Sequence, residues 1–237
     1  MNITYKNEVE EIPLEVVTVT ASNAYSTIAS LSGRVKLVVE GSCSSSDITE
    51  IGEALRNNSD ARIILDLSGT NGLTEIPENF DVIERKASKG IVIINDKLLM
   101  IHTIHGDYKF PGGGLKNGED YISALKREIL EECGYDVDTV GDCVCETIEQ
   151  SYDKFESNKI FRMISLYFIC DINLDNKYVR NLDSYEEEQQ FSEEFIEIEK
   201  AIENNKNLLS SDSDNINPWL ARETNVLTYI KALLFSE

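Results

Sequence analysis

Residues 113–135 read GGLKNGEDYISALKREILEECGY, a glycine turn followed by a helical pattern. Positions three or four residues apart lie on the same face of an α-helix, so Glu128, Glu131 and Glu132 are expected to converge on one patch. Like charges at that spacing repel, and a bound divalent cation is the obvious compensation. An exposed acidic helix is the alternative interpretation, but it leaves the glycines and Arg127 unexplained.

The same segment predicts how the helix packs and where it ends. Apolar residues repeat at helical spacing on the other side and predict a stripe that packs on a sheet: Ile122, Leu125, Ile129 and Cys133. Asn117-Gly118 signals a turn before the helix, and Gly134 stands where a left-handed C-cap belongs. Glu119 and Asp120 suit the positive N-terminus of the helix. The helix is therefore expected to have a core side and a carboxylate side.

The spacing also matches the pattern G-x5-E-x7-R-E-U-x-E-E-x-G-U, in which U is a bulky aliphatic residue. The matching residues are Gly113, Glu119, Arg127, Glu128, Ile129, Glu131, Glu132 and Gly134. This pattern is the Nudix box, and residues 82–237 therefore resemble the Nudix hydrolases. The one departure is Tyr135 at the final aliphatic position, which is expected to face packing rather than a metal. The resemblance implies an α/β fold, a Nudix-type α/β/α sandwich around a mixed sheet.

The resemblance also implies that water attacks a phosphorus atom and breaks the pyrophosphate bond of a nucleoside diphosphate linked to another moiety, with Mg²⁺ or Mn²⁺ as cofactor. By position in the motif, the metal-binding residues are Gly113, Glu128, Glu131 and Glu132, and the catalytic residues are Arg127, Glu128 and Glu131. Arg127 would orient the carboxylates through its planar guanidinium group. The residue types suit this chemistry independently, because clustered carboxylate oxygens bind Mg²⁺ and leave positions open for water and phosphates.

Substrate-binding residues are expected in the glycine loop and in the segments after the box. Gly112 and Gly114 would let the backbone approach the phosphates. Tyr152 follows the box by seventeen residues, a spacing similar to that of the dinucleoside polyphosphate hydrolases, and Arg162 could meet a phosphate. Tyr152 also fits an ordinary strand or loop aromatic. The substrate therefore stays open among dinucleoside polyphosphates, ADP-ribose and nucleoside triphosphates, oxidised ones included.

The sequence leaves open which carboxylate deprotonates the water. It could be a box glutamate or a residue on a later loop, where Glu186, Glu187 and Glu188 form an acidic run. Glu188 is the candidate for such a distal carboxylate. A solvated acidic run without a catalytic role is the alternative.

Two classes of function are compatible with these motifs. The first is a metal-dependent hydrolase. The second is a non-catalytic nucleotide-binding sensor or scaffold whose N-terminal segment binds a partner. The complete set of box carboxylates favours the hydrolase, because nucleotide binding alone does not require them.

Composition limits the partners of the chain. Its 237 residues carry a net charge of -21, which argues against general attraction to nucleic acids or anionic membranes. No apolar run approaches the roughly 18 residues of a membrane span. The first twenty residues hold several glutamates and no signal-peptide pattern, so a cytoplasmic protein with a small phosphorylated nucleotide substrate is expected.

Cysteine and histidine content argues against a structural metal site. The five cysteines include no C-x-x-C pair, so neither a disulfide framework nor a zinc site is expected. The two histidines, His102 and His105, lie three residues apart at the end of an expected strand and should point to opposite faces.

The segment before the Nudix-like part, residues 1–80, alternates between extended and helical patterns. The expected elements are strands at 15–20, 35–40 and 61–67 and helices at 24–31 and 46–56, the second helix capped by Ser46 or Asp47. Residues 35–80 resemble the opening unit of bacterial BspA-like leucine-rich repeats. The residues that carry this resemblance are Val39–Gly41, Asp47-Ile48, Ile51–Leu55, Leu65–Thr70 and Gly72–Phe80.

A repeat fragment of this length needs a cover, because repeat units bury their faces against neighbours. The Nudix-like part and a second subunit are the two candidates for that cover. We therefore expect a homodimer, each chain having a small α/β N-terminal domain at 1–80 and a Nudix domain at 82–237.

Turn signals and apolar patterns place the remaining elements. Asn95-Asp96-Lys97 predicts a hairpin between strands at 86–94 and 98–102. Further strands are expected at 143–149, 161–170 and 194–198, followed by a short helix at 199–204. The last helix should begin with Asn217 as its cap and Pro218 in its first turn, and its core-facing residues should be Trp219, Val226, Ile230, Leu233 and Leu234.

Overall fold

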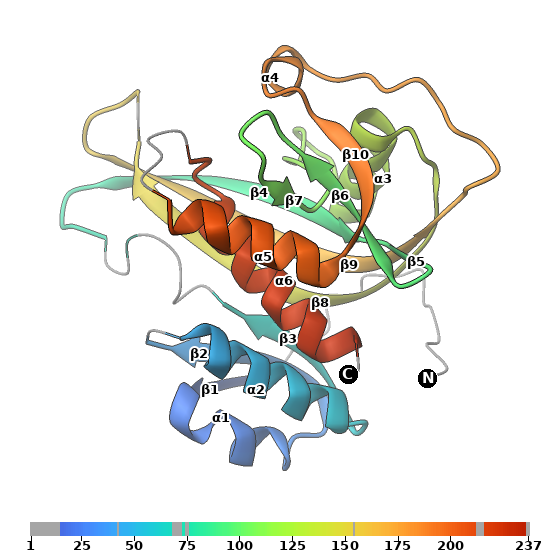
Figure 1. Ribbon diagram of the computed structural model, residues 1–237. Coiled ribbons are helices and arrows are strands. Elements are labelled where there is room, and N and C mark those ends of the chain that lie inside the picture. Colours follow the sequence, from blue (N-terminus) through green and yellow to red (C-terminus); the bar gives the residue numbers. More distant parts are fainter. Residues whose placement is uncertain are drawn as a thin grey trace. The chain divides into compact units, whose positions relative to one another are not determined.

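The computed structural model describes residues 15–41, 43–67, 73, 76–153, 155–211 and 216–235. They belong to two compact units, whose elements are labelled in Figure 1. Unit 1 contains Ala87–Cys143 and Leu166–Thr224, and unit 2 contains the described parts of Glu11–Lys86, Val144–Ser165 and Asn225–Glu237. Each unit combines segments that are distant in sequence, and the expected division into domains at 1–80 and 82–237 stays a prediction.

The first part of unit 2 alternates strands and helices as predicted. Its elements are β1 (Glu15–Thr20), α1 (Ala21–Ile28), β2 (Gly33–Glu40), α2 (Ser45–Asn57) and β3 (Ala61–Asp66). β1 pairs with β2 and β2 pairs with β3, both in parallel. Val35, Leu37 and Val39 of β2 are buried, because alternate side chains of a strand face the same side. The resemblance to a leucine-rich repeat stays a prediction, and residues 42, 68–72 and 74–75 of it lie outside the described residues.

The cap of α2 differs from the prediction. The backbone N–H of Asp47 donates to Oγ of Ser44 at 3.2 Å, and the N–H of Ser44 donates to Oδ2 of Asp47 at 2.7 Å. This reciprocal pair is a capping box, so Ser44 is the N-cap and Asp47 stands three positions later. The prediction of Ser46 or Asp47 as the cap was therefore wrong, although it placed the helix correctly.

Other segments cover this α/β region within unit 2. β3 pairs in parallel with β8 (Val137–Tyr152), where Leu65 lies opposite Cys145. The last helix, α6 (Leu220–Leu234), approaches α2 so closely that a Cβ on Gly52 would lie 2.6 Å from the Cβ of Ala232. These contacts supply part of the cover that was expected from the Nudix-like part or from a second subunit.

Unit 1 contains a four-stranded sheet and the helix that carries the box carboxylates. Its elements are β5 (Ile93–Ile94), β6 (Lys97–His102), β7 (Tyr108–Lys109), α3 (Tyr121–Cys133), α4 (Ser184–Glu188), β10 (Ser192–Glu197) and α5 (Ile198–Leu209). β6 pairs with β10, β5 and β7, all of them antiparallel. Asn95 and Asp96, with φ of 50° and 59°, form the turn between β5 and β6, so the predicted hairpin is confirmed.

Helix α3 packs its apolar stripe into the core of unit 1. Leu125, Ile129 and Cys133 are buried, as their spacing predicted. Gly90 in β4 (Asp81–Ile91) allows strand and helix to approach, since a Cβ there would lie 2.6 Å from Cδ1 of Ile129. Gly134 ends the helix with a φ of 75°, so the predicted left-handed C-cap is confirmed.

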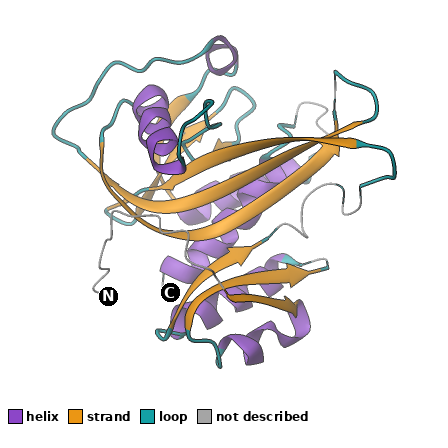
Figure 2. Ribbon diagram, turned by 180° about the vertical axis from the view of Figure 1, so that it is seen from behind, coloured by secondary structure: helices purple, strands orange, loops and turns teal. Residues whose placement is uncertain are grey.

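The longest strands, β8 and β9 (Lys159–Ile172), are neighbours in a sheet whose strand order is β1-β2-β3-β8-β9-β4. Strands are orange in Figure 2. The mixture of helices with a mixed sheet confirms the predicted α/β class. β8, β9 and α5 all extend beyond their predicted ranges. All five cysteines are free, as expected. Within the described part of the chain, no helix combines the length and apolar character that a membrane span requires.

Candidate active site

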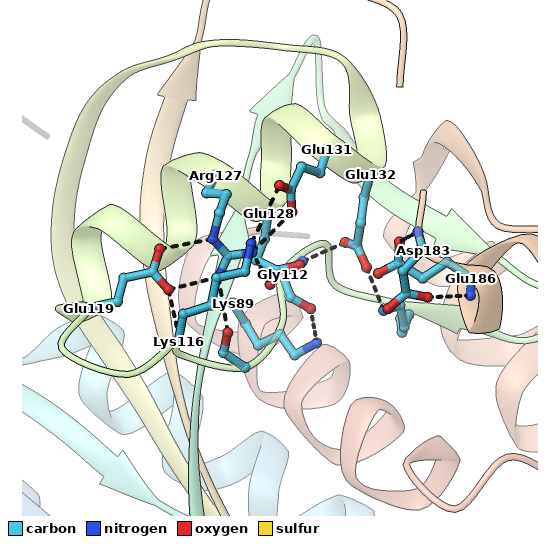
Figure 3. Close-up of polar contacts among 12 residues, drawn as sticks. Lys89, Gly112, Lys116, Glu119, Arg127, Glu128, Glu131, Glu132, Asp183 and Glu186 are labelled. Carbon is cyan, nitrogen blue, oxygen red and sulfur yellow. Dashed lines mark hydrogen bonds and ion pairs between the residues drawn. The ribbon is translucent and has the colours of Figure 1, made fainter. Parts of the chain in front are cut away.

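Arg127 gathers the acidic residues on one side of α3 (Figure 3). Its Nε and one terminal nitrogen donate to the two carboxylate oxygens of Glu119, at 2.9 and 2.8 Å. The other terminal nitrogen donates to Oε1 of Glu128 at 2.5 Å and to Oε2 of Glu131 at 3.0 Å. A further bond reaches the carbonyl oxygen of Gly114 at 3.0 Å. We call Arg127 with Glu119 and Glu131 the Arg127 side.

Glu119 ties the loop before α3 to the helix itself. Besides the two bonds from Arg127, it accepts the backbone N–H of Lys116 at 2.8 Å. The hydrogen bonds from Arg127, and then that from Lys116, lower the pKa of Glu119 to about 2. The carboxylate is therefore ionised at neutral pH, and its role is to hold the loop in place.

A second cation, Lys109, lies on the buried side of α3. Glu132 is 1% exposed, and its two oxygens accept from Nζ of Lys109 at 2.9 Å and from the N–H of Gly112 at 2.7 Å. Burial lowers the pKa of Lys109, but the charge of Glu132 and its hydrogen bond outweigh burial and leave that pKa raised. The ammonium also lies 4.2 Å from the ring centre of Phe191. We call Lys109 with Glu132 the Lys109 side.

Three carboxylates converge between these elements. Glu128, Glu132 and Glu186 each place an oxygen within 4.8 Å of the others, and we call them the carboxylate cluster. Figure 3 shows Glu186 approaching from α4. Burial raises the pKa of Glu128 against the opposing hydrogen bond from Arg127, and the charge of Glu132 adds to this rise. Burial also raises the pKa of Glu186, again with a contribution from Glu132.

The glycine loop depends on two positions without a side chain. A Cβ on Gly112, whose φ is 125°, would lie 2.2 Å from the carbonyl oxygen of Ser88. A Cβ on Gly113 would lie 2.6 Å from Oε2 of Glu128, so only glycine lets this carboxylate reach the loop. The N–H of Ser88 donates to the carbonyl of Gly113 at 3.0 Å, and Nζ of Lys89 donates to that of Gly112.

Lys89 is a third buried cation under this loop. Burial, and secondly the neighbouring charge of Lys109, lower its pKa to about 8. Its side chain reaches a carbonyl rather than a carboxylate, whereas Lys109 is paired with Glu132. The two lysines thus have opposite pKa shifts in almost the same location.

Side chains from two later helices hold β7 and the start of the glycine loop. Asn205 of α5 accepts the N–H of Tyr108 at 2.9 Å and donates to its carbonyl at 2.9 Å, which mimics a partner strand. Glu223 of α6 accepts the N–H of Phe110 at 2.9 Å and the hydroxyl of Tyr167 at 3.0 Å. Asn205 and Glu223 are both fully buried, so the backbone on each side of Lys109 is fixed.

The start of α6 is tied to the loop before β7. Nδ2 of Asn217 donates to Oδ1 of Asp107 at 2.7 Å. Nε1 of Trp219 donates to Oδ2 of Asp107 at 2.9 Å. Asp107 is 1% exposed, and a buried carboxylate requires such donors. The side chain of Asn217 therefore helps to hold this loop, and its predicted role as the cap of α6 stays a prediction.

The structure brings most of the predicted box residues together, and their metal-binding and catalytic roles stay predictions. Glu128 and Glu132 join the carboxylate cluster. Glu131, predicted as a metal ligand, is held by Arg127 and lies 3.7 Å from Nζ of Lys116. Glu188 is exposed at the end of α4 and lies outside the cluster, to which the same helix contributes Glu186 instead.

The two predicted substrate residues after the box belong to unit 2. Tyr152 is 55% exposed, with its ring centre 5.6 Å from that of Phe80. Arg162 donates to Oε1 of Gln150 at 2.9 Å and lies 3.6 Å from Oε2 of Glu84. Neither contact involves a box residue, and the substrate-binding roles of Tyr152 and Arg162 stay predictions.

Sequence reasoning missed Lys89, Lys109, Asn205 and Glu223. The sequence did contain a signal for Asn205 and Glu223, because each is a polar residue on an otherwise apolar face of its helix. Glu223 shares the face of Leu220 and Leu227, and Asn205 shares that of Ile198 and Ile202. A polar residue at such a position predicts a buried hydrogen-bond partner.

Comparisons with known proteins give one family match and several solved structures of low similarity. The family model described as "NUDIX domain" matches residues 84–220. A NUDIX hydrolase from Nitrosomonas europaea is 18% identical, covers 52% of this chain and 79% of its own, and superposes with a TM-score of 0.35. An ADP-ribose pyrophosphatase from Streptococcus suis is 16% identical, with coverages of 65% and 93% and a TM-score of 0.39.

A MutT NUDIX hydrolase from Burkholderia pseudomallei is 13% identical, with coverages of 60% and 98% and a TM-score of 0.37. At such low identities and TM-scores, these likenesses carry no argument about the substrate of this chain. A comparison with curated proteins gave no match.

Proposed function

We propose that this chain, which belongs to the Nudix family and is a pyrophosphohydrolase, uses Mg²⁺ or Mn²⁺ to hydrolyse the pyrophosphate bond of a nucleoside diphosphate linked to another moiety. The observation that carries this proposal is the carboxylate cluster. Its members come from α3 and α4, so the chain brings Glu186 to the box across more than fifty residues.

The cluster fits a hard divalent ion. It offers only carboxylate oxygens, which Mg²⁺ and Mn²⁺ prefer, and Glu128 and Glu132 are largely removed from water. Glu128, Glu132 and Glu186 would hold the ion, with Glu131 adjacent. When bound, a divalent ion neutralises phosphate charge and lowers the pKa of a bound water.

The residues around the cluster would position the substrate and the attacking water. Gly112 and Gly113 let the loop pack closely against Ser88 and Glu128, which brings the loop backbone beside the cluster that would hold the metal and the phosphate chain. Lys109 and Lys89 supply positive charge beneath the loop. Arg127 fixes the orientation of Glu128 through its hydrogen bond to Oε1 of that residue.

Glu128 and Glu186 are the candidates for the general base within the carboxylate cluster, and Glu188, the distal carboxylate predicted from the sequence, lies outside it. A general base must lie within hydrogen-bond reach of the water that it deprotonates, which favours the two residues of the cluster. The pH dependence of kcat/KM in Glu128→Gln and Glu186→Gln separates them. The variant that lacks the base loses the fall of activity at low pH, whereas the other variant retains it.

The deciding experiment is a substrate panel with Mg²⁺ and with Mn²⁺, with products identified. The panel contains a diadenosine polyphosphate, ADP-ribose, a sugar nucleotide and nucleoside triphosphates with and without an oxidised base. Glu128→Gln should reduce turnover of the best substrate by at least about 10²-fold, the scale of a lost general base. Glu203→Gln, which changes an exposed glutamate of α5, is the control and should retain activity. Unchanged turnover in Glu128→Gln would contradict the proposal.

Tyr152 and Arg162 remain proposed substrate contacts. If Tyr152 stacks on a base, Tyr152→Leu raises KM for the preferred nucleotide and leaves kcat nearly unchanged, because a ground-state contact is lost. If Arg162 binds a phosphate, Arg162→Gln raises KM for every substrate in the panel.

The homodimer also remains a proposal, together with the repeat-like character of residues 35–80 and a cytoplasmic location. Since β8 and α6 already cover part of the N-terminal α/β region, a dimer interface would have to use other surfaces. Measurement of molar mass in solution tests the dimer, and a uniform monomer at micromolar concentration would remove it.

A further inference from the structure

We infer that Lys109 is a built-in cation of the metal site, whose ammonium balances part of the negative charge of the carboxylate cluster. The cluster then binds a single divalent ion, and Lys109 acts as a positioning residue for Glu132. This inference rests on the proposed metal-dependent function and assigns that function's metal stoichiometry.

The first argument is the occupation of Glu132. One of its oxygens accepts from Nζ of Lys109 at 2.9 Å, and the other accepts from the N–H of Gly112 at 2.7 Å. Each oxygen keeps a further lone pair, so Glu132 could still hold one ion together with Glu128 and Glu186. A further ion at the same carboxylate would stand close to the ammonium, which would repel it.

The second argument is that the ammonium is fixed in place. The side chain of Lys109 is 10% exposed, and Nζ lies 4.2 Å from the ring centre of Phe191 and 5.9 Å from that of Trp219. Asn205 and Glu223 hold the backbone on each side of it. Moving the ammonium into water would break the ion pair and the ring contacts together.

The third argument is charge. The cluster has three carboxylates, and two of them are already paired with cations, Glu132 with Lys109 and Glu128 with Arg127. One divalent ion is enough to balance the remaining negative charge, so a second would enter a site with no remaining net attraction. Lys89, whose Nζ donates to the carbonyl of Gly112, adds further positive charge there. The other box carboxylates, Glu119 and Glu131, are already paired with Arg127.

The alternative is that Lys109 and Glu132 form only a structural ion pair. The two interpretations predict opposite changes in metal affinity. If the pair only supports the fold, its loss disorders Glu132 and weakens both metal binding and turnover. If Lys109 balances part of the charge of the cluster, its neutralisation strengthens metal binding while turnover falls, because Glu132 loses its fixed orientation.

The test measures Mn²⁺ binding to the purified full chain without nucleotide, by equilibrium dialysis and by electron paramagnetic resonance of the free ion. The wild type should bind one Mn²⁺ per chain. Lys109→Met should bind Mn²⁺ about tenfold more tightly or bind a second ion, since tenfold in affinity corresponds to about 1.4 kcal/mol of removed repulsion. Its kcat on the best substrate should fall by about tenfold or more.

Two further variants control for charge and for folding. Lys116→Met removes an exposed lysine 3.7 Å from Glu131 on the Arg127 side, and its Mn²⁺ binding should equal that of the wild type. Lys109→Gln removes the charge but keeps a hydrogen-bond donor for Glu132. It replaces Lys109→Met if that variant fails to fold, and it should show the same tighter Mn²⁺ binding. Circular dichroism establishes which variants are folded.

The possible outcomes distinguish the role of Lys109 from the proposed metal-dependent hydrolysis. Equal or weaker Mn²⁺ binding in a folded Lys109→Gln, or two tightly bound ions in the wild type, overturns the role of Lys109 and leaves the metal-dependent hydrolase intact. A wild type that binds no Mn²⁺ and hydrolyses its substrate without divalent ions overturns both.

Discussion

Arg127 and Lys109 both bind carboxylates of α3, but Arg127 does so near water and Lys109 does so in the core. Arg127 is 18% exposed and binds Glu119, Glu128 and Glu131 through a planar fork that reaches all of them at once. Lys109 is buried, and its ion pair among the described residues is with Glu132. The first cation binds three carboxylates near water, and the second binds one carboxylate in the core.

The difference decides which carboxylates are rigid. A pair near the surface contributes under about 1 kcal/mol, because water and salt screen it. A buried pair, in contrast, costs about 3–5 kcal/mol when one partner is removed, because a charge or donor stays behind in the core. Glu132 should therefore be the most firmly placed carboxylate of the cluster, while Glu119 and Glu131 can adjust.

The largest effect is expected from a change to Glu223, which holds the backbone next to Lys109. Glu223→Leu removes the acceptor of the Phe110 N–H and of Arg222, both inside the core. We expect the free energy of unfolding to fall by about 3–5 kcal/mol. Urea denaturation followed by tryptophan fluorescence and circular dichroism measures this loss.

The matching change on the Arg127 side is Glu119→Leu. It removes two hydrogen bonds from Arg127, but near water, so we expect a loss of about 1 kcal/mol or less. Glu223→Gln keeps the shape and one acceptor and should fall between the two. Equal losses in Glu223→Leu and Glu119→Leu would remove the contrast between the two sides.

The same contrast explains what the sequence could predict. Arg127 and its partners lie within one box, so helical spacing places Glu131 one turn after Arg127, and Glu119 in the preceding loop is only eight residues away. The supports of the Lys109 side come from 97 and 113 residues further along the chain, at Asn205 and Glu223. No local period connects positions so far apart, and only the packed fold brings them to β7.

The other elements show the same difference between local features, which the sequence predicts, and distant contacts, which it does not. The hairpin at Asn95 and Asp96 and the cap at Gly134 depend on local backbone preference, and both were predicted. The choice between Glu186 and Glu188 was not local. Consecutive residues of a helix point about 100° apart, so only the placement of α4 decides which glutamate meets the cluster.

The second prediction uses the pH dependence of stability. Lys89 has a pKa of about 8 in the folded protein, against about 10.4 for an unfolded lysine. Between these values the unfolded chain holds a proton that the folded protein has released, so folding becomes more favourable as pH rises. The gain should approach about 3 kcal/mol above pH 10.

Lys89→Met has no such proton, so the stability advantage of the wild type over the variant should grow as the pH rises from 7 to about 10. Urea denaturation of both proteins at several pH values measures the difference, in which all other titrating groups cancel. A difference that is constant across this range would show that Lys89 keeps its charge, as Lys109 does.

The third prediction compares two neighbouring box residues by turnover. Glu132→Gln removes a charge from the carboxylate cluster and should reduce kcat/KM by about 10²-fold. Glu131→Gln changes a carboxylate that Arg127 and Lys116 already neutralise, so we expect a loss under about tenfold. The box pattern alone assigns both residues to the metal. Equal losses would favour that assignment over the contrast between the two sides.

The smallest expected effect comes from the exposed end of the Arg127 side. Lys116 is 65% exposed in its side chain, and its Nζ lies 3.7 Å from Glu131, which already accepts a hydrogen bond from Arg127. Lys116→Met should change the free energy of unfolding by less than about 0.5 kcal/mol, and 0.5 M salt should remove even that difference by screening. Urea denaturation at low and high salt measures it. A salt-resistant loss above about 1 kcal/mol would mean that the Arg127 side is as tightly held as the buried one, because only desolvated charges escape screening.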